Sequence, residues 1–165
     1  MTLISASMQE FLGTGHFGTL RVGDSIDSLK HALGEPQLTG GTSRRYRSPR
    51  IWKYGDIEFH LTPDGKHIRL IFCDSYETLT LGPRASLDRW FFDGHPSAET
   101  VGHELAVAGL SFQNATAPHE PTMFLLHLQS GVELIFQGAT VHRSDSSASH
   151  LLGFQLSDAR RKESR

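Results

Sequence analysis

The chain has 165 residues, of which 38% are hydrophobic and 21% are charged, and its net charge is −2; this suits one compact domain with a sizeable core. The charge balance excludes the overall basic field that nonspecific nucleic-acid binding needs. The single cysteine, Cys73, excludes an internal disulfide and a thiolate zinc framework, and is typical of a reducing cytoplasm.

We expect no export signal, because the first 15 residues contain no basic residue and no small-residue cleavage site. No apolar run approaches the roughly 18 residues of a transmembrane helix. We therefore predict a cytoplasmic protein without a membrane span.

Met8, Phe11 and Leu12 lie at helical spacing and predict a short helix over 5–12.

A second helix is predicted between Ser25 and Gly34. The Ser25 side chain can accept hydrogen bonds from the free N–H groups of the first turn. Ile26, Leu29 and Leu33 then share one helical face. Glycine is the common residue just after a helix, so Gly34 should end this one.

A sheet is predicted to follow this helix. Residues 37–48 are polar and contain glycine, which indicates a loop. Alternating apolar residues predict strands over 51–54, 57–61 and 68–73. Proline and glycine within 62–66 indicate the turn between the last two strands.

The second half contains a similar series of elements. We expect an extended piece at 79–81 and a strand over 87–92. A helix should follow over 97–109, then a hairpin over 126–136 and a last strand over 151–156, which would close a second sheet.

Two pairs of matching motifs suggest an internal repeat. The pattern Ser-x-Asp-x-Leu at Ser25 matches Ser-x-Glu-x-Val at Ser97, and the hairpin around Gly55 matches the one around Gly131. The sequence therefore predicts an α+β fold of two degenerate helix-plus-antiparallel-sheet repeats that form one compact domain.

These repeats set the expected boundaries and core. The domain should cover 1–157, with repeats over 17–75 and 87–157, and 158–165 should be a flexible tail. Whether Trp52 and Tyr54 belong to the core or to an interface stays open. The residues expected in the core are Ile26, Leu29, Leu33, Ile57, Phe59, Leu70, Phe72, Val101, Leu105, Leu134 and Phe136.

The motif IWKYGDIEFH at 51–60, preceded by LGEP at 33–36, resembles a family of mostly uncharacterised bacterial cytoplasmic proteins. Several of these are similar to immunity proteins of toxin systems. The resemblance covers roughly residues 17–75 and implies a protein partner but no catalytic residue.

The helix over 25–34 also resembles the repeat unit of the β-lactamase inhibitor protein and of small outer-membrane assembly lipoproteins. This second likeness implies architecture only. The chain lacks the cysteine pairs and export signal of those secreted proteins, so their target and location are not carried over.

An arginine-rich segment is the first candidate site. Arg44, Arg45, Arg47 and Arg50 surround Tyr46. Guanidinium groups bind carboxylate or phosphate with two hydrogen bonds, and a tyrosine ring can stack on a base. The segment therefore suits an acidic protein patch or RNA, although an ordinary solvated loop has the same composition.

The predicted outward face of the sheet is the second candidate. It should carry Asp56, Glu58 and His60 on one strand and His67 and Arg69 on the next. Imidazoles and carboxylates could hold a divalent cation there. Complementary charges across strands are also common stabilisers of a solvated sheet face.

Catalytic signatures are missing. The sequence has no His-Glu-x-x-His, no phosphate loop and no Gly-x-Ser-x-Gly elbow. Cys73 ends an apolar strand, where a buried, inert thiol is the usual case. We therefore assign no catalytic residue, no metal ligand and no cofactor.

Together these observations predict a non-enzymatic protein-binding module, with an immunity or inhibitor role against a toxin or enzyme partner. The alternatives are a metal-dependent hydrolase that uses the His60/His67 face and an RNA-binding module that uses the 44–50 loop. The predicted partner-binding residues are Arg44, Arg45, Arg47, Arg50, Asp56, Glu58, His60, His67 and Arg69.

Overall fold

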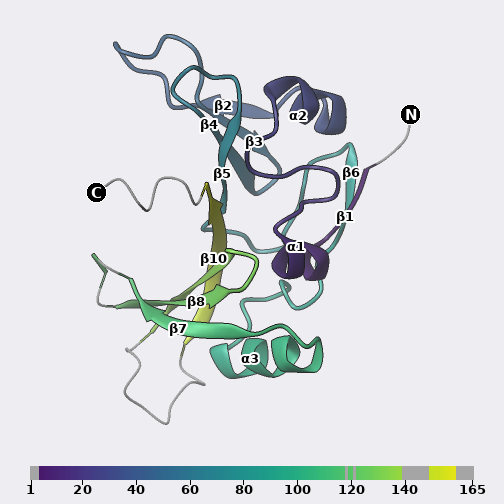
Figure 1. Cartoon of the computed structure of the whole chain (residues 1–165), viewed down its shortest axis with the longest axis vertical. Helices are drawn as coiled ribbons and strands as arrows, with labels where there is room; N and C mark the ends of the chain where they lie inside the picture. Colours follow the sequence, from purple (N-terminus) through teal and green to yellow (C-terminus); the bar gives the residue numbers. More distant parts are fainter. Residues whose placement is uncertain (1–3, 118, 121, 139–148, 159–165) are drawn as a thin grey trace.

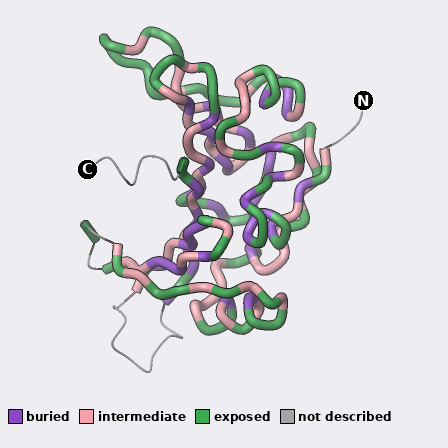
Figure 2. Tube along the Cα trace, viewed as in Figure 1, coloured by how far each residue is buried: buried purple, intermediate pink, exposed green. Residues whose placement is uncertain are grey.

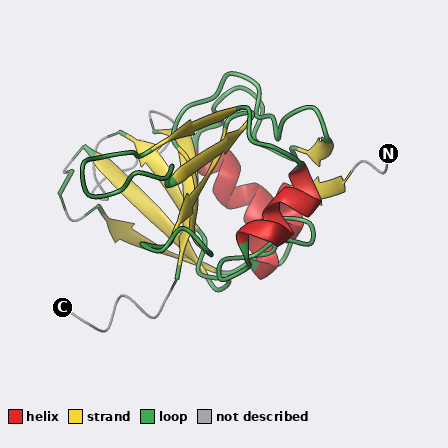
Figure 3. Ribbon diagram, turned by 90° about the horizontal axis from the view of Figure 1, so that it is seen from above, coloured by secondary structure: helices red, strands yellow, loops and turns green. Residues whose placement is uncertain are grey.

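The computed structural model describes residues 4–117, 119–120, 122–138 and 149–158. These residues form an α+β fold built around an eight-stranded sheet. All three described helices lie on one side of this sheet, and the opposite face of the strands carries no described helix (Figures 1 and 3). The fold therefore has one covered sheet face and one face without a helical layer, which we call the open face.

Each helix begins at a serine whose side chain accepts a hydrogen bond from the first turn. Such caps satisfy N–H groups that have no partner within the helix. No helix in the described ranges is long and apolar enough to cross a membrane. The helices are α1 (Met8–Thr14), α2 (Ile26–Leu33) and α3 (Ala98–Val107).

The helix predicted to begin after Ser25 is confirmed, and Gly34 ends it in a conformation with φ of 79°. The expected first helix starts three residues late, because Ile4–Ser7 forms strand β1. This strand pairs in parallel with β6 (Ala85–Asp88) in a separate two-stranded sheet. The strand expected over 87–92 is therefore wrong beyond Asp88.

The large sheet has the strand order β2-β3-β4-β5-β10-β9-β8-β7, and every neighbouring pair is antiparallel. In each half of the chain, a helix precedes four strands that follow one another as neighbours. The strands are β2 (Leu38–Gly40), β3 (Ile51–Tyr54), β4 (Ile57–Leu61), β5 (Ile68–Cys73), β7 (Phe112–Thr116), β8 (Met123–Leu128), β9 (Glu133–Gln137) and β10 (His150–Ser157).

Two edge strands were not predicted. Both β2 and β7 consist mainly of polar or small residues, so neither has the apolar alternation that identifies a strand. The last strand, β10, was predicted, but it pairs with β5 rather than closing a second sheet. This pairing joins the two halves into one sheet.

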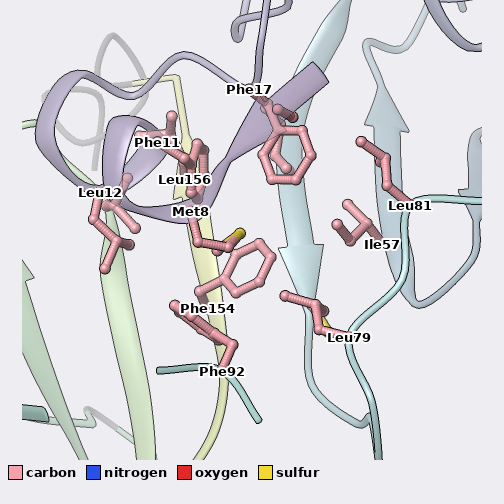
Figure 4. Packing of buried hydrophobic residues seen from close by; sticks show 14 of the residues in the cluster. Met8, Phe11, Leu12, Phe17, Ile57, Leu79, Leu81, Phe92, Phe154 and Leu156 are labelled. Atoms are coloured by element: carbon pink, nitrogen blue, oxygen red, sulfur yellow. The ribbon is translucent and has the colours of Figure 1, made fainter. Parts of the chain in front are cut away.

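The core fills the space between the sheet and the helical layer (Figures 2 and 4). Phe11 packs edge-on against Phe17 and Phe154, with ring centroids 5.1 and 5.3 Å apart. Trp52 and Tyr54 are buried in this core, which settles the choice that the sequence left open. Most of the predicted core residues are buried, and Ile26 packs against the core at its margin.

Leu70 and Phe72 are the exceptions, because both lie on the open face. The register between β4 and β5 shifts between the pairs His60↔Leu70 and Leu61↔Ile68. Such a bulge inserts one residue, here Arg69, and reverses the side-chain alternation beyond it. Ile71 therefore takes the core position that we predicted for its neighbours.

Candidate binding surface

A row of directly opposed residues crosses the open face from one sheet edge to the other. Residues opposite each other in neighbouring strands point to the same side of a sheet, so each registered pair extends the row. We call it the charged row. It consists of Leu38, Lys53, Glu58, Phe72, Gln155, Glu133, His127 and Gln113.

Glu58 is the charged centre of the first half. Its two carboxylate oxygens lie 3.6 Å from Lys53 Nζ and 2.9 Å from His60 Nε2. The His60 ring in turn packs edge-on against Phe72, with ring centroids 5.8 Å apart. Glu58 thus pairs with Lys53 across β3 and β4 and with His60 on its own strand, and the contact with Glu58 holds the His60 ring in one orientation.

Glu133 has the corresponding place in the second half. Its carboxylate lies 3.1 Å from His127 Nδ1 and accepts a hydrogen bond from Gln155 Nε2. This cluster was not predicted, because the two hairpins were matched on Gly55 and Gly131. The second turn is one residue longer. Aligning the charged strand positions instead would have matched Glu133 with Glu58.

The second part of the surface is the segment 41–50 between β2 and β3, which we call the arginine loop. It projects from the same end of the sheet as the β4–β5 turn and is largely exposed (Figures 1 and 2). The Tyr46 ring lies under the Arg50 guanidinium at 3.8 Å and beside that of Arg45 at 5.5 Å. Arg50 also donates to the Thr62 carbonyl at 3.0 Å. These contacts tie the loop to the turn.

A cavity of about 250 Å³ lies between the arginine loop and strands β4 and β5. We call it the arginine hollow. Three basic side chains and no acidic one line it. The Nε atom of Arg69 is buried and has no hydrogen-bond partner, which costs about 1–3 kcal/mol for a donor of this kind. The lining residues are Gly41, Tyr46, Arg50, Ile51, His60, Leu61, Pro63 and Arg69.

A second cavity of about 200 Å³ lies on the outer side of the arginine loop. Arg45, Arg47 and Arg50 line it together with Asp64 of the β4–β5 turn. Hydrogen bonds from the Thr62 hydroxyl and the Lys66 N–H lower the pKa of Asp64. The outer cavity is thus basic with one ionised carboxylate at its rim.

The two neighbouring cavities are therefore lined by five of the predicted residues: Arg45, Arg47, Arg50, His60 and Arg69. Glu58 is hydrogen-bonded to His60. Arg44 is exposed in the same loop but lines neither cavity.

Asp56 lies apart from the two cavities. It is in the β3–β4 turn, at the opposite end of this hairpin from Arg50. Both the N–H and the hydroxyl of Thr80 donate to its carboxylate at 2.8 Å. Asp56 therefore anchors the segment that follows β5.

His67 also lies outside the two cavities. It is exposed just before β5, where its backbone bridges to Ser25 at the start of α2. No group of three or more His, Cys, Asp or Glu side chains suited to a metal ion occurs among the described residues. The proposed His60/His67 cation site is thus not supported by the placement of these residues.

Cys73 is buried on the core side of β5, as predicted. Burial raises the pKa of its thiol from 9.0 to about 12. The folded protein therefore keeps the thiol protonated at neutral pH, where it is a poor nucleophile.

The alkaline stability of the protein should depend on this thiol. Because its pKa is raised on folding, its contribution is fully present below about pH 9 and is lost as the pH rises toward 12. The free energy of unfolding is measured by urea titration at pH 8 and at pH 10. We expect it to fall less between these two pH values for Cys73→Ala than for the wild type. Tyr54 and Tyr76, also raised in pKa by burial, are common to both proteins. Equal losses would contradict the assignment.

Comparison of the chain with family models, with curated proteins and with solved structures found no match. The family resemblance carried by residues 51–60 therefore stays a prediction.

Proposed function

We propose that the chain is a non-enzymatic protein-binding module that uses its open sheet face and the arginine loop. The favoured role is that of a bacterial cytoplasmic immunity protein or inhibitor that neutralises a toxin or enzyme. One observation carries the proposal: the sheet face without a described helix holds a row of paired, partly buried charges that leads to a group of arginines. Such mixed surfaces select partners by electrostatic complementarity.

The size of this face fits the proposal. Eight strands at about 4.8 Å spacing span about 34 Å, and a standard interface buries about 800 Å² on each partner. Phe72 lies at the middle of the charged row and is half-buried, and Leu38 at its edge is 65% exposed. Apolar side chains between charges are typical of interface centres.

The same surface is less suited to stacking on RNA bases. One face of the Tyr46 ring is already covered by Arg50, and Arg45 lies near the ring as well. A base stacking on the face that Arg50 covers would have to displace this cation–π contact. We therefore favour an acidic protein partner for the arginine loop.

Matching backbone contacts support the interpretation of the two halves as repeats. Ile26 N donates to Lys66 O at 2.9 Å, and Ala98 N donates to Ser149 O at 2.9 Å. In both halves this bond ties the start of a helix to the residues before the last strand. Two copies of one unit, joined at β5 and β10, would explain how a short chain builds so wide a face.

The proposal predicts the effect of a charge reversal. We expect Arg45→Glu to weaken partner binding by about tenfold or more, because an acidic partner patch would then face a like charge. Stability should barely change, since Arg45 is exposed. The measurement is calorimetric titration against the protein encoded by the neighbouring gene, with protection from toxicity on co-expression as a second readout.

Arg21→Glu is the matched control, because Arg21 is an exposed arginine before α2 in the helical layer. It should leave the affinity unchanged. Equal affinities of wild type, Arg45→Glu and Arg47→Glu for a confirmed partner would remove the arginine loop from the interface.

A further inference from the structure

We propose that the arginine hollow is an oxyanion site that receives the carboxylate of an acidic side chain on a protein partner. The identity of the ligand as a partner's side chain rests on the proposed function. The affinity of the hollow for a carboxylate is independent of that function. The hollow would then bind one type of side chain, a carboxylate.

The basic groups of the hollow come from three separate places in the chain. Arg50 precedes β3, His60 lies near the end of β4, and Arg69 is the bulge residue of β5. Arg69 follows the core-facing Ile68 and has no partner in the β4–β5 register, because the bulge lies at this residue. The fold thus brings two guanidinium groups and an imidazole to one cavity.

Two of the three groups are held in place. The Arg50 guanidinium is fixed by the Tyr46 ring at 3.8 Å and the Thr62 carbonyl at 3.0 Å. His60 Nε2 lies 2.9 Å from Glu58 Oε2, which fixes the imidazole ring at the wall of the hollow. Groups oriented before binding lose less entropy when the ligand arrives.

Arg69 is the group that lacks a partner. Its Nε is buried without a hydrogen bond, and no acidic side chain lines the hollow. A carboxylate can accept from Nε and a terminal nitrogen of one guanidinium at the same time. A small rotation of the Arg69 side chain toward such a ligand would satisfy the unpaired donor.

The walls and the volume of the hollow favour an amino-acid side chain. Ile51, Leu61 and Pro63 provide apolar surface for the methylene groups of a glutamate. A volume of about 250 Å³ is below the roughly 300 Å³ at which pockets for drug-sized ligands begin. A space of this size accommodates a glutamate side chain.

The test uses the free protein and a small probe. N-acetyl-glutamate methylamide is titrated at constant ionic strength, and the arginine Nε–H and histidine ring signals are followed by NMR. We expect saturable shifts of the Arg69 and His60 signals with this probe. The matched glutamine derivative should cause none, because it lacks the charge.

Variants locate the site. Arg69→Gln and Arg50→Gln should each weaken the binding of the glutamate probe by about tenfold or more, whereas Arg21→Gln should not. Arg21 is an exposed arginine before α2 and does not line the hollow. Circular dichroism shows whether each variant is folded, and the two hollow variants provide independent tests.

Three results would overturn the inference: no saturable shift, equal shifts with the glutamine probe, or tighter binding of inorganic phosphate than of the glutamate probe. The first two would remove the hollow as an oxyanion site while leaving partner binding by the rest of the open face intact. The third would make it a phosphate site. Failure of Arg45→Glu to affect a partner, with probe binding intact, would instead count against the proposed function.

Discussion

Replacing Phe59 with alanine should lower the free energy of unfolding by about 3–5 kcal/mol. The side chain is fully buried on the core side of β4. Its ring packs edge-on against Tyr54 and Phe17, with centroids 5.8 and 6.5 Å apart. Truncation would remove these contacts and leave a cavity that the surrounding strands cannot fill. Urea denaturation followed by circular dichroism measures the effect.

Phe72→Ala is the matched control for this prediction. Phe72 is on β5, but the bulge at Arg69 turns its side chain to the open face, where it is half-buried. We expect a loss of less than half that of Phe59→Ala, since less apolar surface leaves the protein interior. Comparable losses would contradict the register of β5.

Gly153→Ala should destabilise the protein by about 3 kcal/mol, at the upper end of the range for overpacked substitutions. A Cβ atom at this position would overlap the carbonyl oxygen of Cys73 and lie 2.6 Å from its carbonyl carbon and 2.9 Å from Asp74 Cα. These are backbone atoms, so no side chain can move aside. The clash falls at the pairing of β10 with β5, which joins the two halves of the sheet.

The control is Gly40→Ala in β2, where a Cβ would meet no atom within 4 Å. We expect its free energy of unfolding to stay within about 0.5 kcal/mol of the wild type. Thermal and urea unfolding of both variants give the comparison. A Gly153→Ala protein as stable as the wild type would show that β5 and β10 are not in this close contact.

The local elements were the part of the fold most readily predicted. The capped helix after Ser25 and the β3–β4 hairpin around Gly55 were found because helix caps and glycine turns depend on residues close in the sequence. The strand β2 was missed because an edge strand of Leu-Thr-Gly has no apolar alternation to reveal it.

Part of the candidate surface was also predicted from composition. The arginines of the 44–50 segment indicated a basic site, and Arg45, Arg47 and Arg50 line the two cavities. The contact of Asp56 with Thr80 was not predicted, because the two residues are distant in sequence. The second acidic cluster, at Glu133, depended on a turn length that the glycine alignment obscured.

The sequence by itself determined the α+β class, the helices with serine caps, most core positions and the arginine-rich segment, because each depends on neighbouring residues or on a regular spacing. Only the tertiary structure decided that β10 joins β5 and that Arg69 occupies a bulge beside Arg50 and His60. Strand order and register arise from pairing between distant segments, and a shift of one residue moves every later side chain to the other face. The charged row and the arginine hollow are products of that pairing.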